Sequence, residues 1–382
     1  MSDPYLPLQL DGSALAAVRD ALAERIKVGL SSEGQEIKAL PAYLTQPDPG
    51  VSGRAIVVDT GGTNMRAALV ELRPGATPIV SDAASGEVPR DPGRPIGAEE
   101  FFHLQAELVR ELNPPPDLPV GYCFSYPTTN ERDGDATLLR WTKGIQIEGV
   151  EGSRVGSALS RALESLDVHP GPLRVLNDTV AALMAGAWLA QGESESIGLI
   201  VGTGNNMAAF LQREGSERMA VNLESGNFFP PGLSLWDDEL DALSDNPGQQ
   251  RIEKAVSGLY LPHLFRRIFP DSSLVDPALG SQALGELRQR GEHGPETEVA
   301  GLLLDRSADL VGAAIAGVCQ HLPESRPVCV IAEGSLFWKT PGYRERVTTT
   351  AKNLLGPSRG LSIEGVEHAN LIGSACAALS EQ

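Results

Sequence analysis

Apolar runs along this chain twice lead into a glycine turn and then into a further apolar run. The first pair is Arg54 to Val58 and Met65 to Leu72, and the second is Ile197 to Val201 and Met207 to Leu211. Short runs rich in Val, Ile and Leu predict buried strands. Because Arg73-Pro74-Gly75 ends one run too early for a helix, the turns are predicted to be hairpins.

The two predicted hairpins resemble each other. One constant offset aligns Gly62 with Gly204, Asn64 with Asn206, and Met65 with Met207. Similarity between two parts of a chain predicts two related lobes that face each other across a cleft. Each lobe would then offer one hairpin turn to the same ligand.

Other segments carry apolar residues at helical spacing. Residues 13–27 predict an amphipathic helix that opens on Ser13 as its cap, and a long helix is expected over 248–268, just after Pro247. Further helices are expected at 98–112, 151–166 and 298–321, and further strands at 119–124 and 328–332. The sequence therefore predicts a mixed α/β protein.

Length and charge narrow the functional classes. A chain of 382 residues exceeds the usual size of a single hydrophobic core, so two lobes are expected. Its 41% of apolar residues and 21% of charged residues are ordinary for a soluble globular protein. A formal charge of −19 argues against nucleic-acid and anionic-membrane partners, which bind basic faces. It does not exclude a nucleotide, because backbone amides and a metal ion can hold phosphates locally.

The cysteines are far apart in the chain, at Cys123, Cys319, Cys329 and Cys376. This spacing predicts neither a zinc cluster nor a disulfide framework and fits a reducing cytoplasm. The first residues lack a basic segment followed by an apolar core, and no stretch approaches the roughly 20 apolar residues of a membrane span. A cytoplasmic protein is therefore expected.

Asn177-Asp178-Thr179 stands between an apolar run and a helical pattern. These residue types are favoured helix caps, so a structural cap is one interpretation. A catalytic carboxylate is the other, because the positive end of a helix dipole helps to keep a base ionised. Taken alone, the three residues favour the cap.

The glycine turns have a similar pair of interpretations. Gly61 and Gly62 would let backbone N–H groups approach phosphate oxygens, and Asp59 would hold magnesium through water. A tight hairpin without any ligand also favours Gly-Gly and Asn. The second turn, Gly202 to Asn206, lacks the third glycine of a dinucleotide fingerprint, since Met207 follows it.

Further polar segments occur that core packing does not require. In chain order, the whole series is Leu40 to Tyr43, Asp59 to Arg66, Phe124 to Pro127, Trp141 to Gly144, Asn177 to Thr179, Ile197 to Asn206, Asn246 to Lys254, Ser257 to Tyr260, and Glu333 to Ser335. This ordered series resembles the hexokinase family, the sugar kinases of the actin-like ATPase fold. Asn-Pro-Gly-Gln-Gln and Trp-Thr-Lys-Gly are its most specific segments. The cysteine zinc motif of the repressor-related sugar kinases is absent.

The resemblance implies a two-lobed α/β fold of the actin-like ATPase (ribonuclease H-like) type, with mixed sheets flanked by helices and a cleft between the lobes. The small lobe would comprise 52–176 and 371–382, and the large lobe 1–51 and 177–370. It also implies transfer of the γ-phosphoryl group of Mg-ATP to the 6-hydroxyl of glucose or a related hexose. A non-catalytic sugar sensor on the same fold is the alternative. The protein would be a monomer or a homodimer.

The resemblance also implies roles for individual residues. Asp178 would act as general base, with Lys143 as a second catalytic residue. The implied sugar contacts are Ser125, Pro127, Thr142, Lys143, Asn177, Asp178, Asn206, Glu224, Gln250 and Glu253. The implied nucleotide contacts are Asp59, Gly61, Gly62, Thr63, Asn64, Arg66, Thr203, Gly204, Gly334 and Ser335. Asp59 and Asp178 would hold Mg²⁺ through water.

Two segments depart from the family pattern. Ser225 stands where the family has an aromatic residue, and the loop then runs into Pro230-Pro231. Near the end, Ala369-Asn370-Leu371 replaces a glycine-serine-glycine turn. Sugar recognition and nucleotide preference are therefore expected to be altered at these two places. The sequence does not rank the hexoses or the phosphate donors.

Overall fold

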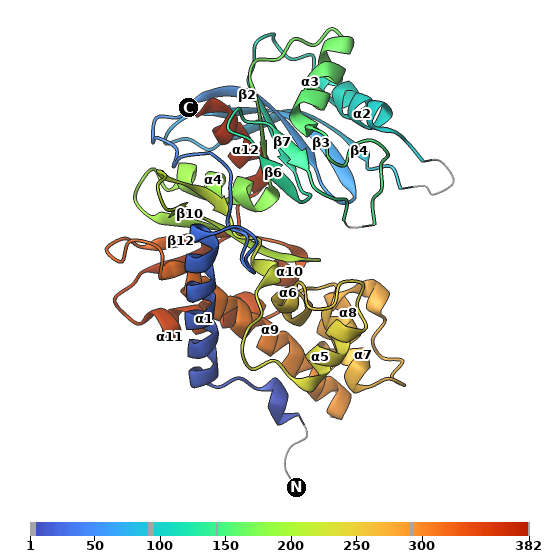
Figure 1. Ribbon diagram of the computed structural model, residues 1–382, viewed down its shortest axis with the longest axis vertical. Helices are drawn as coiled ribbons and strands as arrows, with labels where there is room; N and C mark the ends of the chain where they lie inside the picture. Colours follow the sequence, from blue (N-terminus) through green and yellow to red (C-terminus); the bar gives the residue numbers. More distant parts are fainter. Residues whose placement is uncertain (1–4, 91–94, 143, 291–293, 381–382) are drawn as a thin grey trace.

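Two mixed β-sheets organise the chain (Figure 1). The computed structural model describes residues 5–90, 95–142, 144–290 and 294–380. In Figure 1, α2 and α3 lie at the top, α1, α9 and α11 toward the bottom, and α4 and α12 between these groups. Among the described residues, no helix combines the length and the apolar character needed to cross a membrane.

The first sheet has the strand order β4-β3-β2-β5-β8. Its strands are β2 (Gly53–Thr60), β3 (Asn64–Leu72), β4 (Ile79–Glu87), β5 (Val120–Phe124) and β8 (Leu173–Leu176). Strands β2, β3 and β4 are antiparallel, whereas β5 and β8 run parallel to β2. Successive β2 side chains point to opposite faces. Ile56 and Val58 pack with α2 (Ala98–Glu111) and α3 (Val155–Ser165), and Ala55 and Val57 pack with α12 (Ala369–Leu379).

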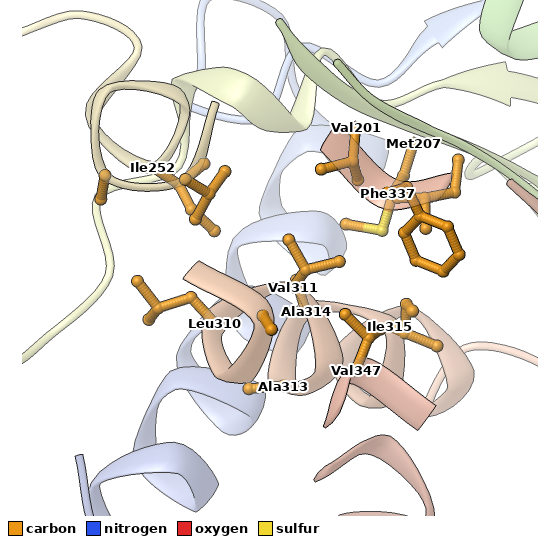
Figure 2. Packing of buried hydrophobic residues seen from close by; sticks show 14 of the residues in the cluster. Val201, Met207, Ile252, Leu310, Val311, Ala313, Ala314, Ile315, Phe337 and Val347 are labelled. Atoms are coloured by element: carbon orange, nitrogen blue, oxygen red, sulfur yellow. The ribbon is translucent and has the colours of Figure 1, made fainter. Parts of the chain in front are cut away.

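The second sheet has the strand order β1-β11-β10-β9-β12-β13. Its strands are β1 (Leu40–Pro41), β9 (Glu195–Val201), β10 (Asn205–Gln212), β11 (Arg218–Asn222), β12 (Val328–Glu333) and β13 (Leu361–Glu364). One face packs on α4 (Asp178–Leu189). The other packs on α1 (Gly12–Ser31), α9 (Pro295–Cys319) and α11 (Tyr343–Leu355). Figure 2 shows α9 side chains such as Val311 and Ile315 beside Met207 and Phe337.

Smaller elements complete the fold. The hairpin β6 (Thr128–Asn130) and β7 (Ala136–Leu138) follows β5. The remaining helices are α5 (Leu235–Ala242), α6 (Arg251–Val256), α7 (Leu261–Ile268), α8 (Ser281–Gln289) and α10 (Ser335–Lys339). Short 3₁₀ turns are η1 (Leu6–Leu8), η2 (Ser225–Asn227) and η3 (Pro277–Leu279).

The two sheets repeat one topology. In the first sheet, β2, β3 and β4 are antiparallel, and the parallel strands β5 and β8 lie on the other side of β2. In the second sheet, β9, β10 and β11 are antiparallel, and the parallel strands β12 and β13 lie on the other side of β9. The predicted repeat is thus confirmed, but its constant offset was wrong. Thr60 pairs with Met65, whereas Val201 pairs with Asn205. The second turn is one residue shorter, so Met65 corresponds to Asn205 rather than to Met207.

Helices α4 and α12 cross in close contact between the sheets. A Cβ on Gly373 would lie 1.8 Å from the carbonyl oxygen of Ala181. Each helix also packs closely on one sheet. A Cβ on Gly198 in β9 would lie 2.1 Å from Thr179 O in α4, and a Cβ on Gly121 in β5 would lie 2.2 Å from Ser374 O in α12. Only glycine fits at these points, and the first residues of α4 are thereby fixed relative to both sheets.

Three predicted elements differ in detail. Helix α1 is capped by Asp11, whose Oδ1 accepts a hydrogen bond from Ala14 N at 2.8 Å, rather than by Ser13. The helix predicted from 151 begins only at Val155. The long helix predicted over 248–268 is two helices, α6 and α7. Between them Ser257 is extended, and Gly258 N donates to Gly202 O at 2.7 Å. The helix is interrupted so that the chain can contact the second hairpin turn.

Candidate active site

The Asn177-Asp178-Thr179 motif lies where β8 ends and α4 begins. Asn177 is the N-cap, and its side chain accepts a hydrogen bond from Thr179 N at 3.0 Å. Asp178 Oδ1 also accepts from Thr179 N, at 2.8 Å. The cap interpretation is therefore confirmed for Asn177. The half-buried carboxylate of Asp178, the next residue, lines a cavity.

This cavity has a volume of about 750 Å³ and is called here the acidic cavity. Its walls come from the turn between β2 and β3, the end of β4, the residue after β5, and the first turns of α4 and α12. The lining residues are Asp59, Gly61, Gly62, Thr63, Asn64, Arg66, Ser85, Gly86, Glu87, Ser125, Asp178 and Asn370. Eight residues predicted from the sequence thus lie around one space, although they come from distant segments.

Asp59 and Arg66 face each other across the first hairpin. They are paired in the ladder of β2 and β3, and Arg66 Nη2 donates to Asp59 Oδ2 at 2.6 Å. Asp59 is buried, whereas the Arg66 side chain is 40% exposed toward the cavity that it lines. The guanidinium therefore keeps donors available for an anion, in a form suited to phosphate.

Burial and the charges of Asp59 and Asp178 raise the pKa values of two neighbouring groups, Cys123 and Glu333. Burial raises the pKa of the Cys123 thiol, and the charges of Asp59 and Asp178 raise it further. At the end of β12, burial raises the pKa of Glu333 to about 7, with a further rise from Asp178 and Asp59 and a partial offset from Arg66. The acidic groups thus lie near one another, where a cation would be stabilised.

Four predicted residues, Asn206, Glu224, Gln250 and Glu253, form hydrogen bonds among themselves and with Asn205 and Asn222. This group is called here the carboxamide network. Gln250 Nε2 donates to Glu253 Oε1 at 2.9 Å, and Asn205 N donates to Glu253 Oε2 at 2.9 Å. Asn206 Nδ2 donates to Asn222 Oδ1 at 2.8 Å, and Asn222 Nδ2 donates to Glu224 Oε1 at 2.9 Å.

Glu224 connects this network with the acidic cavity. Burial raises the pKa of Glu224, the charge of Asp178 raises it further, and Lys38, Asn222 and Arg140 lower it in part. Glu224 and Gln250 also share a left-handed backbone, with φ of 52° and 51°. Residues other than glycine rarely adopt this conformation, which costs of order 1 kcal/mol or more and is concentrated at functional sites.

The second hairpin turn lines another cavity, of about 650 Å³, called here the glycine-rich cavity. Gly202, Thr203, Gly258, Gly280 and Ser335 contribute to its wall, together with residues of η3 and α8. Gly334, just before Ser335, has φ of 116°, and a Cβ there would lie 2.2 Å from Val201 O. The start of α10 therefore packs directly against the end of β9, which holds Ser335 at the wall of the cavity.

The remaining predicted residues line neither of these two cavities. They are Pro127, Thr142, Asn177, Asn206, Glu224, Gln250, Glu253, Gly204 and Gly334. A Cβ on Gly204 would lie 2.9 Å from Glu253 Oε2, so that glycine leaves room for the carboxamide network. Lys143 falls outside the described residues.

Sequence reasoning missed several side chains of the site. Asn222 bridges Asn206 and Glu224, and Lys38 and Arg140 are charges near Glu224. Asn370 lines the acidic cavity. The one available signal was its position in the segment that departs from the family pattern. Lys38 and Arg140 carry no local signal, because only the fold brings them to the site.

Comparison with protein-family models shows to which family this chain belongs. A sequence model described as hexokinase matches residues 5–188, and a second one, also described as hexokinase, matches 196–293 and 296–380. Together they match nearly all of the chain. The chain belongs to the hexokinase family.

Individual hexokinases are similar over most of this chain. Hexokinase-2 of Equus caballus is 31% identical over 91% of the chain, which covers 44% of that protein. Hexokinase-2 of Solanum tuberosum is 28% identical, with 93% of this chain and 85% of that one covered. The hexokinase of Schwanniomyces occidentalis is 29% identical, with coverage of 91% and 84%. The chain thus spans about half the length of the horse relative.

Solved structures establish the fold. A hexokinase from Schistosoma mansoni in complex with glucose superposes with a TM-score of 0.83 and 26% identity, covering 98% of this chain and 96% of that chain. A ROK hexokinase from Thermus thermophilus is more distant, with a TM-score of 0.57, 21% identity and coverage of 85% and 98%. The predicted two-lobed actin-like ATPase fold is therefore confirmed.

Proposed function

We propose that this protein transfers the γ-phosphoryl group of Mg-ATP to the 6-hydroxyl of glucose or a related hexose, giving hexose 6-phosphate and ADP. The observation that carries the proposal is the acidic cavity, in which the Asp178 carboxylate shares one space with the first glycine turn and Arg66. A base, backbone donors and a cation are the groups that phosphoryl transfer needs. Membership of the hexokinase family and the likeness to a glucose-bound hexokinase support a hexose as the acceptor.

The carboxamide network is proposed to recognise the hexose. Each hydroxyl of a sugar both donates and accepts hydrogen bonds, and Asn, Gln and Glu side chains complement this. The proposed sugar contacts are Ser125, Pro127, Thr142, Lys143, Asn177, Asp178, Asn206, Glu224, Gln250 and Glu253. An analogue that lacks one hydroxyl would leave buried polar partners unpaired, so selectivity among hydroxyl patterns is expected to be strong.

The two glycine turns are proposed to bind ATP. Asp59, Gly61, Gly62, Thr63, Asn64 and Arg66 would contact its phosphates from the acidic cavity. Thr203 and Ser335 would contact the nucleotide from the glycine-rich cavity. Gly204 and Gly334, which adjoin them in the chain, are proposed as further nucleotide contacts. A Cβ on Gly258 would lie 2.9 Å from Gly202 O, so Gly258 packs directly on the second turn and helps to hold it in place.

The acidic cavity also fits Mg²⁺. Among the described residues, no group of three or more His, Cys, Asp and Glu could enclose a metal ion by itself. Magnesium is commonly bound by one or two carboxylates, waters and substrate phosphates, and Asp59 and Asp178 supply such carboxylates. When bound, the ion would neutralise charge on the transferred phosphoryl group.

Asp178 is proposed to accept the proton of the 6-hydroxyl as that oxygen attacks phosphorus. Its place in the first turn of α4 puts the carboxylate at the positive end of the helix dipole. Asn177 fixes the turn by capping it. Arg66, held by Asp59, would stabilise the charge of the phosphoryl oxygens. A sensor that only bound sugar would not need Asp59, Arg66 and Asp178 in one cavity, and this favours an enzyme.

Three further expectations remain proposals. The small lobe would comprise 52–176 and 371–382, and the large lobe 1–51 and 177–370. The protein would act in the cytoplasm as a monomer or a homodimer. Neither nucleic acid nor a membrane would be a partner, given the formal charge of −19.

The function is tested by measuring ADP release from Mg-ATP with a panel of hexoses. ADP is expected only when a hexose is present. Asp178→Ala is expected to lower kcat by about 10² to 10⁴-fold, the usual contribution of a general base, while hexose binding persists. Absence of hexose-dependent ADP across the panel would refute the proposal.

Asp11→Ala is the matched control. Asp11 is also an aspartate at a helix start and accepts a hydrogen bond from Ala14 N, but α1 packs on the far face of the second sheet. Its loss is expected to lower stability by about 1 kcal/mol and to leave kcat unchanged. Equal losses of kcat in both variants would contradict a catalytic role for Asp178.

A further inference from the structure

Tyr126 connects the loop after β5 with the first glycine turn. Its hydroxyl donates a hydrogen bond to the carbonyl oxygen of Gly61 at 2.7 Å, and the side chain is 1% exposed. The preceding residue, Ser125, donates its N–H to Thr60 O at 3.1 Å. The loop that carries Ser125 is therefore attached twice to the segment that leads into Gly61 and Gly62.

This hydrogen bond fixes the orientation of one peptide group. The described residues contain no cis peptide bond, so the carbonyl of Gly61 and the N–H of Gly62 point in opposite directions. With the carbonyl held by Tyr126, the N–H of Gly62 points away from the tyrosine. Both glycines line the acidic cavity. A peptide between two glycines is less restricted than other peptides, so this partner narrows the orientations that it can adopt.

The tyrosine ring is itself held from the side of the proposed sugar contacts. Trp141 meets it edge-on, with ring centroids 4.7 Å apart and an interplanar angle of 83°. Trp141 is fixed by a hydrogen bond from its Nε1 to Ile147 O at 3.1 Å. The next residue, Thr142, is one of the proposed sugar contacts. A packed path therefore leads from the sugar loop through Trp141 and Tyr126 to Gly61.

We propose that Tyr126 is a positioning residue that orients the Gly61–Gly62 peptide so that the Gly62 N–H serves as a donor to the phosphates of the nucleotide. The inference rests on the proposed function, since it assumes that phosphates occupy the acidic cavity. Tyr126 does not contact the phosphates itself. It acts through the backbone, in the way that a preorganised donor lowers the reorganisation needed at the moment of reaction.

The test is Tyr126→Phe, which removes only the hydroxyl. Tyr343→Phe is the matched control, because the Tyr343 hydroxyl is also buried and shares a hydrogen bond with Ser307 Oγ at 2.7 Å, in the core of the second sheet. For wild type and both variants, we would measure the Kd of the magnesium complex of β,γ-imido-ATP by calorimetry. Steady-state KM and kcat for ATP and hexose, and the Tm, complete the comparison.

Loss of one hydrogen bond corresponds to roughly a 2- to 10-fold change in an equilibrium constant. For Tyr126→Phe, we expect the Kd of the ATP analogue and the KM for ATP to rise by about that factor, while the KM for hexose stays within about 2-fold. Tyr343→Phe should leave all of these constants unchanged, even if its Tm falls. A Tyr126→Phe variant with wild-type nucleotide Kd and KM would overturn the inference.

The two proposals fail in different ways. If wild-type protein neither binds the ATP analogue nor releases hexose-dependent ADP, the proposed function is wrong. If wild type is active and the two tyrosine variants lose nucleotide affinity equally, the function stands and the role of Tyr126 is only structural, which refutes the inference.

Discussion

At the scale of single residues, the fold raises the pKa of Glu333, whose carboxyl group interacts with the charges of the acidic cavity. Glu333 is half-buried at the end of β12, and burial together with Asp178 raises its pKa to about 7 from the ordinary 4.5. The charge of Arg66 offsets this rise only in part. The negative charge of Glu333 is thus unfavourable in the protein without bound metal or nucleotide, and a positive charge in the cavity would relieve it.

A stability profile tests this perturbation. Between about pH 4.5 and 7, the folded protein binds more protons at Glu333 than the unfolded chain, so the free energy of unfolding falls as pH rises. Glu333→Gln is expected to flatten this part of the profile. It should raise stability above pH 7 by about 1 to 2 kcal/mol, after allowing for partial solvent screening. Chemical denaturation from pH 4 to 9, without metal or nucleotide, measures the difference.

Glu364→Gln is the control for that experiment, since Glu364 is exposed on the neighbouring strand β13. Its profile should follow that of wild type. Added Mg²⁺ should lower the pKa of Glu333 and shift the slope to lower pH, because a cation stabilises a nearby carboxylate. Parallel profiles for wild type and Glu333→Gln would contradict the assignment.

Among the elements, α4 and α12 determine where the site residues lie. Helix α4 carries Asp178 and α12 carries Asn370, and both residues line the acidic cavity. The two helices can cross this closely because Gly373 has no side chain. The contact therefore supports the fold and also holds two cavity walls together.

Gly373→Ala is expected to disrupt this crossing. The new Cβ would lie 1.8 Å from Ala181 O, so backbone must move, and a loss of about 3 kcal/mol or more is expected, within the range of severe core substitutions. Thermal and urea denaturation measure the loss. Gly301→Ala in α9 is the control, because no atom lies within 4 Å of its added Cβ, and it should stabilise by up to about 1 kcal/mol. Similar effects in both variants would contradict the packing argument.

At the scale of the whole molecule, the two glycine turns line separate cavities. The proposed reaction requires both turns to act on one nucleotide. A movement of the two sheets toward each other would meet this requirement and would also exclude water that could otherwise accept the phosphoryl group. Such a movement is therefore expected when substrates bind.

Small-angle X-ray scattering tests the closure. Saturating glucose is expected to reduce the radius of gyration, as in hinge closure around a ligand. Galactose, which has one inverted hydroxyl, serves as the control sugar if the panel shows that it is not phosphorylated. An unchanged radius of gyration with a bound and phosphorylated hexose would show that the catalytic form is already closed.

The sequence by itself determined the mixed α/β class, both hairpins, and most helices and strands, because each depends on local periodicity and turn residues. It also assigned Asp59, Arg66 and Asp178 to one predicted site, and the structure brings all three to one cavity. It did not predict the break between α6 and α7, because Gly258 leaves the helical path to contact Gly202, a partner distant in sequence.

Only the tertiary structure decided which residues meet. The raised pKa of Glu333 results from burial and from charges on other elements, and neither is visible in the segment around it. The hydrogen bond from Tyr126 to Gly61 joins loops 65 residues apart. A linear pattern records which side of one element is buried. The contacts of a site depend instead on how several elements pack, which is fixed by close approaches such as those at Gly373 and Gly198.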